Sequence, residues 1–279
     1  MKSKKYSPII SVAIFILIGL LLAGCTGSSQ PTQPLETPKP AQPEPQDQPE
    51  KTVILSTINW EPYTGEELLN DGFFSEIVTE AFARVGYSVE YQYRPWARAL
   101  QEAIDGDVHG VMDVYWTEER VEFLSYPDVV WTVKEEFIAL SDHPITYSGS
   151  LDNFDGFTIG VLRDSAPADE LKAAGVAIDE ISEEKQNAQK LLIGRVDAVL
   201  SPRSIFFYHA EQQEPQFDQT RVKILEPPFK VYEMYVAFSK KNPDYEQLTA
   251  DFNRGLSLIK DDGTYAEIVK KHGMIMSEE

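Results

Sequence analysis

The stretch "YSVEYQYRPWARALQEAIDGDVHGVMDV", residues 87–114, decides the fold class of this chain. Its first eight residues alternate as a strand does. Pro95 then opens a helix whose apolar residues recur at helical spacing from Trp96 onward, and "VHGVMDV" is typical of a second strand. Upstream, the strand-like "TVILSTI" (52–58) and the helical "FFSEIVTEAFARVG" (73–86) form the preceding unit. Two successive strand-helix-strand units predict a parallel sheet with right-handed crossovers.

A second set of alternating elements follows further along the chain. It begins at "FTIGVL" (157–162), continues through a predicted helix at "EEKQNAQKLLIG" (183–194) to the strand "RVDAVLS" (195–201), and closes with a helix from about Pro202. The chain from Thr52 onward is long enough for two lobes of roughly 100 residues each. Each set of elements therefore predicts one lobe.

Two further strands are expected to join the lobes. "TVKEEFIALSD" (132–142) leaves the first lobe, and "VYEMYVAFSK" (231–240) returns to it ahead of two amphipathic helices. We therefore predict an α/β fold of two Rossmann-like lobes joined by two hinge strands, with lobe 1 at 52–139, lobe 2 at 140–232 and a return to lobe 1 at 233–279. Ligands of such sheets bind at the carboxyl ends of the strands, so we expect the site in the cleft between the lobes.

The N-terminal segment has the composition of a targeting and tethering region. Lysines among the first five residues precede a 16-residue apolar run, short for a membrane span, so residues 1–24 are expected to be a secretory signal. The run ends in "LLAGC", which resembles a bacterial or archaeal lipobox, and the resemblance implies cleavage before Cys25 and lipid on its sulfur. Residues 25–51 contain little to bury and are expected to form an extended, Pro-rich tether.

Composition and motifs argue against several classes of function. The formal net charge of −20 opposes binding to phosphate backbones, so we expect no nucleic-acid partner. A single cysteine makes neither an intrachain disulfide nor a metal cluster, and the histidines are scattered, without an HExxH pair. GxSxG and phosphate-loop motifs are absent from the sequence. We expect no metal, no cofactor and no enzymatic activity, although an acid/base pair among the many carboxylates stays open.

The order of the motifs resembles that of a known family. "INWEPYTG", "PWARAL", "TEER" with "FLSYP", "TIGVLRDSA", "GRVDAVLS" and "DGTYAEIVKKHG" follow one another as in the family 3 extracellular solute-binding proteins, the amino-acid type of periplasmic binding protein. The resemblance spans nearly everything from Thr52 to Gly273. It implies the type 2 periplasmic-binding-protein fold, in which two lobes close on a small polar solute that is delivered to an ABC importer.

The arginine in "DVYWTEER" (113–120) is the main candidate for a ligand contact. Thr117, three residues earlier, is consistent with an ordinary capped turn in which Arg120 pairs with Glu118, Glu122 or another neighbour. Alternatively, Arg120 points into the cleft and binds a carboxylate with its bidentate fork. In the resembled family, the arginine at this place clasps the α-carboxylate of the ligand, which favours the second interpretation.

Five more candidates belong to lobe 1. Trp60 follows the first strand, where the resembled family often has an aromatic ring over the ligand; otherwise it packs in a loop. Trp96 begins a helix expected to face the cleft, but it shares that helix's apolar stripe and also suits the core. Arg98 lies off the stripe and reaches either the pocket or solvent. Asp113 and Tyr115 follow the third strand, where the family often has small hydroxyl residues. These larger side chains would narrow the pocket, and a carboxylate there would hold a cation.

The candidates of lobe 2 lie at two strand ends. In "VLRDSA" (161–166), Ser165 either caps the following helix or, with the free backbone N–H groups beside it, forms an anion site. The family often has glycine where Asp164 stands. The acid that grips the α-ammonium in the family's amino-acid binders corresponds to Pro202, whose side chain cannot bind an ammonium, and Arg203 is its neighbour.

The loss of that acid bears on the class of solute. Unless Asp113 substitutes for it, a standard α-amino acid lacks one charge-assisted contact. Arg120, Arg163 and Arg203, with Arg98 as a fourth candidate, instead favour an anionic ligand.

These observations predict a monomeric, extracytoplasmic solute-binding protein, anchored to the membrane through lipid on Cys25, that binds an amino-acid-like or organic-acid solute and works with an ABC permease. Two alternatives remain: a ligand-sensing partner of a membrane receptor, and a cleft enzyme of the dehydratase kind.

Overall fold

Nine strands form one mixed sheet in the part of the chain that the computed structural model describes, residues 51–274. The order along the sheet is β2-β1-β3-β9-β5-β8-β6-β7, with β4 paired to β9. The strands are β1 Lys51–Thr57, β2 Tyr87–Tyr93, β3 Gly110–Tyr115, β4 Leu124–Ser125, β5 Trp131–Leu140, β6 Thr158–Leu162, β7 Ala177–Ile181, β8 Ala198–Ser201 and β9 Val222–Ser239. The signal, Cys25 and nearly all of the tether lie outside the described residues.

Seven α-helices and four short 3-10 turns complete the described residues. The helices are α1 Phe73–Ala83, α2 Trp96–Asp105, α3 Ala166–Ala173, α4 Lys185–Leu192, α5 Arg203–Gln213, α6 Tyr245–Asp261 and α7 Thr264–Lys271. The 3-10 turns are η1 Leu69–Asp71, η2 Arg120–Glu122, η3 Leu151–Phe154 and η4 Gln219–Arg221. Within residues 51–274, no helix combines the length and apolar character needed to cross a membrane.

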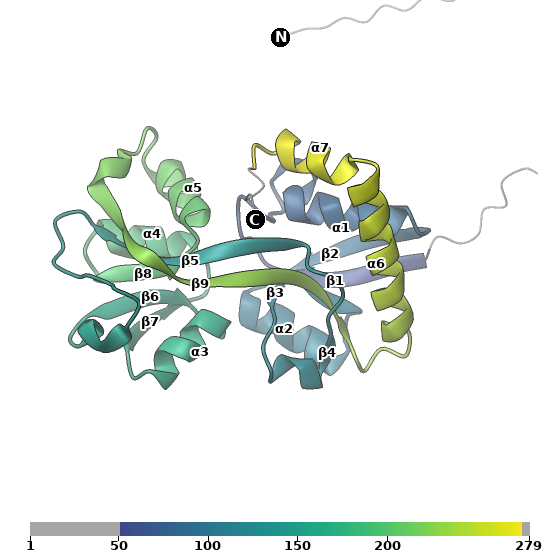
Figure 1. Cartoon of the computed structure of the whole chain (residues 1–279), viewed down its shortest axis with the longest axis horizontal. Coiled ribbons are helices and arrows are strands. Elements are labelled where there is room, and N and C mark those ends of the chain that lie inside the picture. Colours follow the sequence, from purple (N-terminus) through teal and green to yellow (C-terminus); the bar gives the residue numbers. More distant parts are fainter. Residues whose placement is uncertain (1–50, 275–279) are drawn as a thin grey trace, which may run out of the picture. The chain divides into compact units, whose positions relative to one another are not determined.

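Lobe 1 is built on three parallel strands, as the alternating pattern predicts. β1 lies between β2 and β3 and pairs in parallel with both. Helix α2 packs on β1 and β3, while α1, α6 and α7 pack together (Figure 1). The contact between α1 and α6 depends on Gly255, because a Cβ there would lie 1.9 Å from the carbonyl oxygen of Ala81. The buried rings of Phe73, Phe82 and Phe252 belong to the core of this lobe.

Lobe 2 repeats the arrangement with its own core. β6 pairs in parallel with β7 and β8, helix α3 packs on β6 and β7, and α4 packs against α5 (Figure 1). Two clusters of buried residues form its interior, one around Phe137 and Phe154 and the other around Phe206. Ala166 and Ile205 belong instead to the cluster of lobe 1, so apolar side chains of lobe 2 pack across the interface.

The antiparallel strands β5 and β9 run between the lobes, as predicted (Figure 1). β9 pairs with β3 in lobe 1, and β5 pairs with β8 in lobe 2. Their mutual register shifts in the middle: Glu135 lies opposite Lys230, but Phe137 lies opposite Leu225. β9 starts at Val222, earlier than the predicted 231–240. The prolines of "EPPF" (226–229) donate no ladder hydrogen bond, but the residues on the N-terminal side of this stretch are again paired in the sheet.

Candidate functional site

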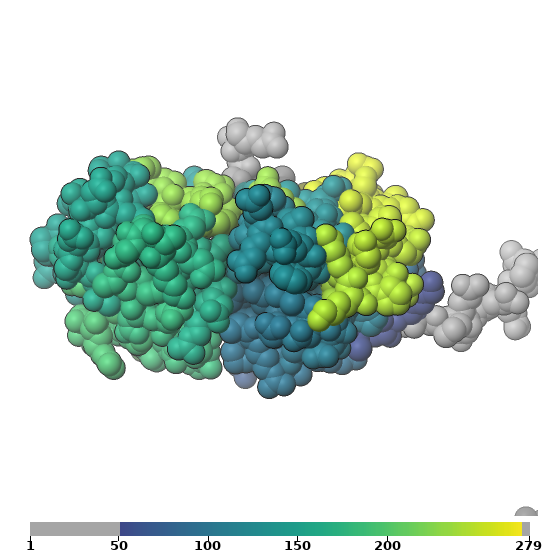
Figure 2. All heavy atoms as spheres, turned by 90° about the horizontal axis from the view of Figure 1, so that it is seen from below, coloured from purple at the N-terminus to yellow at the C-terminus, as the bar shows by residue number. Residues whose placement is uncertain are grey.

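A cavity of about 430 Å³, counting the part that opens to solvent, lies between the lobes. Lobe 1 lines it with the segment after β1, the first turn of α2, β3 and η2. Lobe 2 lines it with the turn from β6 into α3, the residue before α4 and β8, and β5 adds a side chain from the hinge. It thus lies at the carboxyl ends of parallel strands, as the fold predicts. In Figure 2, the atoms of lobe 2 (green) lie against those of lobe 1 (blue) on one face of the molecule.

Among the described residues, three side-chain hydrogen bonds join the lobes at or near this cavity. The indole Nε1 of Trp96 and the Nη2 of Arg120 both donate to the backbone carbonyl of Asp164, at 2.9 and 3.0 Å. The hydroxyls of Tyr63 and Ser204 lie 2.7 Å apart. Asp164 has a φ of 55°, in the left-handed region that glycine, Asn and Asp adopt most readily. Aspartate therefore suits a turn where the resembled family often has glycine.

Arg120 combines both interpretations that the sequence offered. Its backbone N–H donates to the hydroxyl of Thr117 at 3.2 Å, so the capped turn is present. Its guanidinium is nevertheless buried in the cavity wall, where it lies 5.5 Å from the ring of Trp96 and donates to the carbonyl of Tyr115. Burial lowers the pKa of Arg120. Within residues 51–274 it has no carboxylate at ion-pair distance, and the charges of Asp169 and Glu119 act on it only from further away.

Asp113 reaches the cavity from a bulge in β3. The pairing of β3 with β9 shifts between Val111 and Val114, and Asp113 has a φ of 58° there. Bulges of this kind redirect a side chain beside a functional site. The carboxylate is buried, and its Oδ2 accepts hydrogen bonds from Thr57 (2.6 Å) and Thr64 (3.2 Å). Oδ1 has no partner among the described residues, and burial raises the pKa of Asp113 to about 7.

Glu135 contributes a second carboxyl group from the hinge strand β5. Its Oε1 accepts a 2.8 Å hydrogen bond from the hydroxyl of Tyr115, another cavity residue, while Oε2 has no partner among residues 51–274. Burial, followed by the nearby charge of Glu184, raises the pKa of Glu135 to about 8. The ring of Tyr115 stacks on that of Tyr232, which fixes the hydroxyl that holds Glu135.

Glu184 contributes a third carboxyl group, from lobe 2 at the start of α4. Its Oε2 accepts from the amide of Asn187 at 3.0 Å and from the hydroxyl of Ser201 at 3.3 Å. Burial raises the pKa of Glu184 to about 7. The indole N–H of Trp60 lies near this carboxylate and favours its ionised form, although it makes no hydrogen bond of normal geometry.

Ser165 lies where it can both cap helix α3 and contribute to an anion site, the two interpretations that the sequence offered. As the N-cap of α3, its Oγ accepts from the N–H of Ala168 at 3.2 Å and donates to the carbonyl of Leu162 at 2.7 Å. Its side chain also lines the cavity. Because the hydroxyl is used within lobe 2, the cap accounts for its hydrogen bonds.

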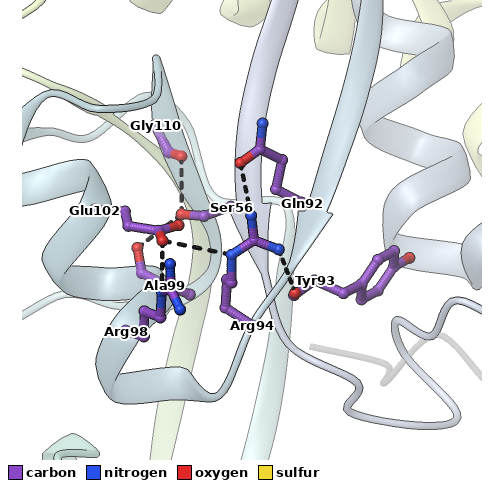
Figure 3. A network of polar contacts seen from close by, with 8 residues as sticks. All are labelled: Ser56, Gln92, Tyr93, Arg94, Arg98, Ala99, Glu102 and Gly110. Atoms are coloured by element: carbon purple, nitrogen blue, oxygen red, sulfur yellow. Dashed lines mark hydrogen bonds and ion pairs between the residues drawn. The ribbon is translucent and has the colours of Figure 1, made fainter.

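Four predicted residues lie outside the wall of this cavity. Figure 3 shows Arg98 turned towards Glu102, to which its Nε donates at 2.7 Å, and Arg94 binds the same carboxylate at 3.4 Å. The side chain of Arg98 is 67% exposed. Its position on α2 thus directs it to a surface network within lobe 1.

The other three belong to lobe 2. Arg163 is exposed beside the cavity turn. Pro202 is buried as the N-cap of α5. Arg203 donates through Nε to Glu136 at 2.6 Å and forms an ion pair with Glu226 at 3.5 Å. Of the four arginines proposed from the sequence, only Arg120 therefore lines the cavity, and the expectation of an anionic ligand loses most of its support.

Glu135 and Glu184 were missed by the sequence analysis. Glu135 stands in "TVKEEFIALSD", where two acids interrupt an otherwise apolar strand, and that interruption was the available signal. Glu184 follows the strand "AIDEI" (177–181) at a carboxyl end. In a chain with 45 Asp and Glu residues, neither acid is distinguished by composition.

A second, larger cavity of about 750 Å³ adjoins the first and shares Ile58 and Glu184 with it. It is lined mostly by charged and polar side chains from both lobes, among them Glu61, Arg94 and His209. His209 is buried, its Nε2 lies 3.6 Å from a carboxylate oxygen of Glu61, and burial lowers its pKa to about 4. The imidazole is therefore neutral at ordinary pH.

Comparison with known proteins identifies a family and a fold. Residues 53–274 match the sequence family described as bacterial extracellular solute-binding proteins, family 3. No curated protein matches the chain in sequence. Among solved structures, a histidine kinase sensor domain with similarity to periplasmic binding proteins superposes with a TM-score of 0.72 at 17% identity, covering 82% of this chain and 99% of that domain.

Two binding proteins are similar to a comparable extent. The substrate-binding protein of an amino acid ABC transporter has a TM-score of 0.66 at 19% identity, with 79% of this chain and 98% of that protein covered. An ancestral arginine-binding protein bound to glutamine has a TM-score of 0.65 at 25% identity, with coverages of 80% and 97%. The described residues thus have the type 2 fold of periplasmic binding proteins, as predicted.

Proposed function

The chain belongs to the bacterial extracellular solute-binding proteins of family 3, and we propose that it captures a small polar, amino-acid-like solute between its lobes and delivers it to an ABC importer. It would act outside the cytoplasm as a monomer, held to the membrane by lipid on Cys25. The likeness to the substrate-binding protein of an amino acid ABC transporter supports the importer as partner.

The observation that carries this proposal is the composition of the central cavity. Both lobes and the hinge line it, and they bring buried ionisable groups to one enclosed space. Buried polar groups are usually satisfied within a protein, whereas a ligand site keeps some of them for the ligand. Here Oδ1 of Asp113 and Oε2 of Glu135 have no partner among residues 51–274.

Closure of the lobes would couple binding to recognition by the importer. Trp60, Asp113, Tyr115 and Arg120 of lobe 1 would receive the solute first. The Ser165 turn of lobe 2 would then close over it while β5 and β9 bend at their shifted register. A solute drives such a transition only by binding the closed form more tightly than the open one.

A cleft enzyme is a second candidate, because the cavity holds carboxyl groups that titrate near neutral pH. Burial raises the pKa values of Glu135 and Glu184 to about 8 and 7, in the range that suits a general acid. Such an enzyme of the dehydratase kind would consume its ligand, whereas a binding protein returns the ligand unchanged.

Native mass spectrometry of the full chain, purified in detergent, tests the proposal. The protein would be exposed to pooled amino acids, organic acids and amines. We expect one solute to be retained, to be lost in Arg120→Ala, and to persist in the matched variant Arg98→Ala, whose arginine lies outside the cavity. A solute that is retained equally by Arg120→Ala would remove Arg120 from the site. A change in the mass of the released solute would favour the enzyme.

A transport assay tests the partner. The solute-loaded protein should stimulate the ATPase of the candidate importer reconstituted in vesicles, and the solute-free protein should do so less. If the loaded protein instead bound a membrane receptor and left the importer inactive, the sensory role would be favoured.

A further inference from the structure

We propose that the solute bound in the central cavity carries a cation in its side chain, an ammonium or a guanidinium with several N–H donors beyond any α-ammonium, and that this group is held by Asp113, Glu135 and Glu184. The inference rests on the proposed function, because it names the class of solute for the same cavity. It reverses the anionic ligand that the arginines of the sequence favoured.

Two carboxylate oxygens in the cavity wall lack hydrogen-bond donors among the described residues: Oδ1 of Asp113 and Oε2 of Glu135. Both side chains are more than nine-tenths buried, with exposed fractions of 6% and 4%. The second oxygen of each is fixed, by Thr57 and Thr64 in one case and by Tyr115 in the other. Each side chain therefore keeps one acceptor for a donor that residues 51–274 do not supply.

Charge also favours a cation. The cavity wall holds three carboxyl groups and one guanidinium. Arg120 does not neutralise the acids, because it donates to the carbonyls of Tyr115 and Asp164 and has no carboxylate partner within residues 51–274. Where these acids are ionised, an anionic ligand would add to the negative charge, whereas an ammonium or guanidinium would reduce it and supply the missing donors.

The surroundings suit an organic cation better than a metal ion. Among the described residues, no three His, Cys, Asp or Glu side chains are grouped closely enough to hold a metal. The same wall contains the rings of Trp60 and Tyr115, whose centroids lie 6.0 Å apart. Aromatic faces attract alkylammonium and guanidinium groups and also cover the apolar part of such a solute.

The three acids come from three separate parts of the fold: Asp113 from lobe 1, Glu135 from the hinge and Glu184 from lobe 2. Burial, followed by the charge of Glu184, raises the pKa of Glu135, so the ionised forms of these two acids repel each other. A cation in contact with acids of both lobes binds the closed form more tightly than the open form, which is the differential affinity that closure requires. Arg120 remains available for a carboxylate on the same solute.

Isothermal titration of the full chain with matched pairs of ligands tests the inference. Arginine is compared with its neutral isostere citrulline, lysine with norleucine, which lacks the side-chain ammonium, and glutamate serves as the anion. We expect at least one of the two cations to bind at least tenfold more tightly than its neutral counterpart. The same cation should lose at least tenfold in affinity in Glu135→Gln and in Asp113→Asn.

A matched variant controls for the overall charge of the protein. Glu90→Gln removes the same charge from an exposed position on β2 and should leave the affinity unchanged. Thermal melts check that each variant is folded, and the two cavity variants test the inference independently. Tight binding of glutamate, citrulline or norleucine in preference to the cations would overturn the inference while leaving solute capture intact. If no solute of any charge bound to the folded protein, the proposed function would fail with it.

Discussion

Trp96 of lobe 1 donates its indole N–H to the backbone carbonyl of Asp164 in lobe 2, at 2.9 Å. The bond joins the lobes only while they are closed, so it should stabilise the closed form and not the open one. Trp96→Phe keeps an aromatic ring but removes the donor. Because a neutral hydrogen bond contributes about 0.5 to 1.5 kcal/mol, we expect a loss of solute affinity of about 2- to 10-fold.

Titration of the variant against wild type measures the effect. Trp116→Phe serves as the control, because Trp116 is 52% exposed and does not line the central cavity. Equal affinity in wild type and Trp96→Phe would mean that this contact does not contribute to closure.

Solute binding should depend on pH if the solute is cationic. A cation favours the ionised carboxylates, so it binds most weakly where Asp113, Glu135 and Glu184 are protonated, below their pKa values of about 7, 8 and 7. Affinity should rise with pH up to about 8, by as much as about tenfold per pH unit for each proton displaced, and then level off.

Other charged groups near Asp113, Glu135 and Glu184 limit the pH dependence of the affinity. Glu136 raises the pKa of Glu135 but is itself paired with Arg203, and the guanidinium of Arg120 stays charged throughout. Titrations with arginine at pH 6, 7 and 8 measure the slope, because the guanidinium of the ligand does not titrate there. A flat profile for a bound cation would show that the acids are already ionised in the free protein.

The stability of the ligand-free protein should fall as pH rises. Glu135 has a pKa of about 8 in the folded state, against 4.5 for an unperturbed glutamate, so between these values the folded state binds more protons than the unfolded state. Stability is therefore highest below the unfolded pKa and decreases through the folded pKa. His209 has the opposite effect below pH 6.5, because burial lowers its pKa to about 4.

The interval from pH 6.5 to 8 isolates the carboxyl groups. There the melting temperature of wild type should decrease by several degrees, and Glu135→Gln should reduce that decrease because it removes one buried charge. Differential scanning calorimetry of both proteins without solute gives the comparison. A Glu135→Gln melt that follows wild type over this interval would mean that Glu135 is not the titrating group.

The fold was predictable because local periodicity determines it. The alternation in "YSVEYQYR" and the helical spacing after Pro95 indicate which side chains of each segment are buried in the folded protein. The start of β9 was not predictable in the same way. Pro227 and Pro228 interrupt its pattern, although β9 pairs with β5 on both sides of them, and β3 joins only its C-terminal part.

The site was predictable only where a motif fixes the position of the side chain. Trp60 and Arg120 lie beyond strand ends, Asp113 lies in the bulge of β3, and all three line the cavity. Arg98 and Arg203 have similar sequence signals, but both pair with acids. Glu102 lies one helical turn from Arg98 in the same helix, whereas only the tertiary structure brings Glu136 near Arg203. The direction of a charged side chain depends on such partners and not on its place in a motif.

Asp113 should tolerate only substitutions that suit its backbone. Its φ of 58° is accessible to Asn at little cost but strained for a β-branched residue. Asp113→Asn should fold with nearly unchanged stability, whereas Asp113→Val should lose about 1 to 3 kcal/mol from backbone strain, with an additional loss from the unpaired hydroxyl of Thr57. Urea unfolding of both variants measures this difference. Equal stability of the two would contradict the strained bulge.

The change in stability caused by Gly255→Ala should differ in sign according to whether helix packing or helix propensity dominates. Glycine inside an exposed helix is less stable than alanine by about 1 kcal/mol, so Gly255→Ala in α6 would stabilise an isolated helix. In this protein the new Cβ would lie 1.9 Å from the carbonyl oxygen of Ala81. The clash should separate α1 from α6, and we expect a net loss of about 1 to 3 kcal/mol. Ser257→Ala, on an exposed position of the same helix, should be neutral or slightly stabilising in the same thermal melts. A more stable Gly255→Ala variant would mean that the two helices do not pack this closely.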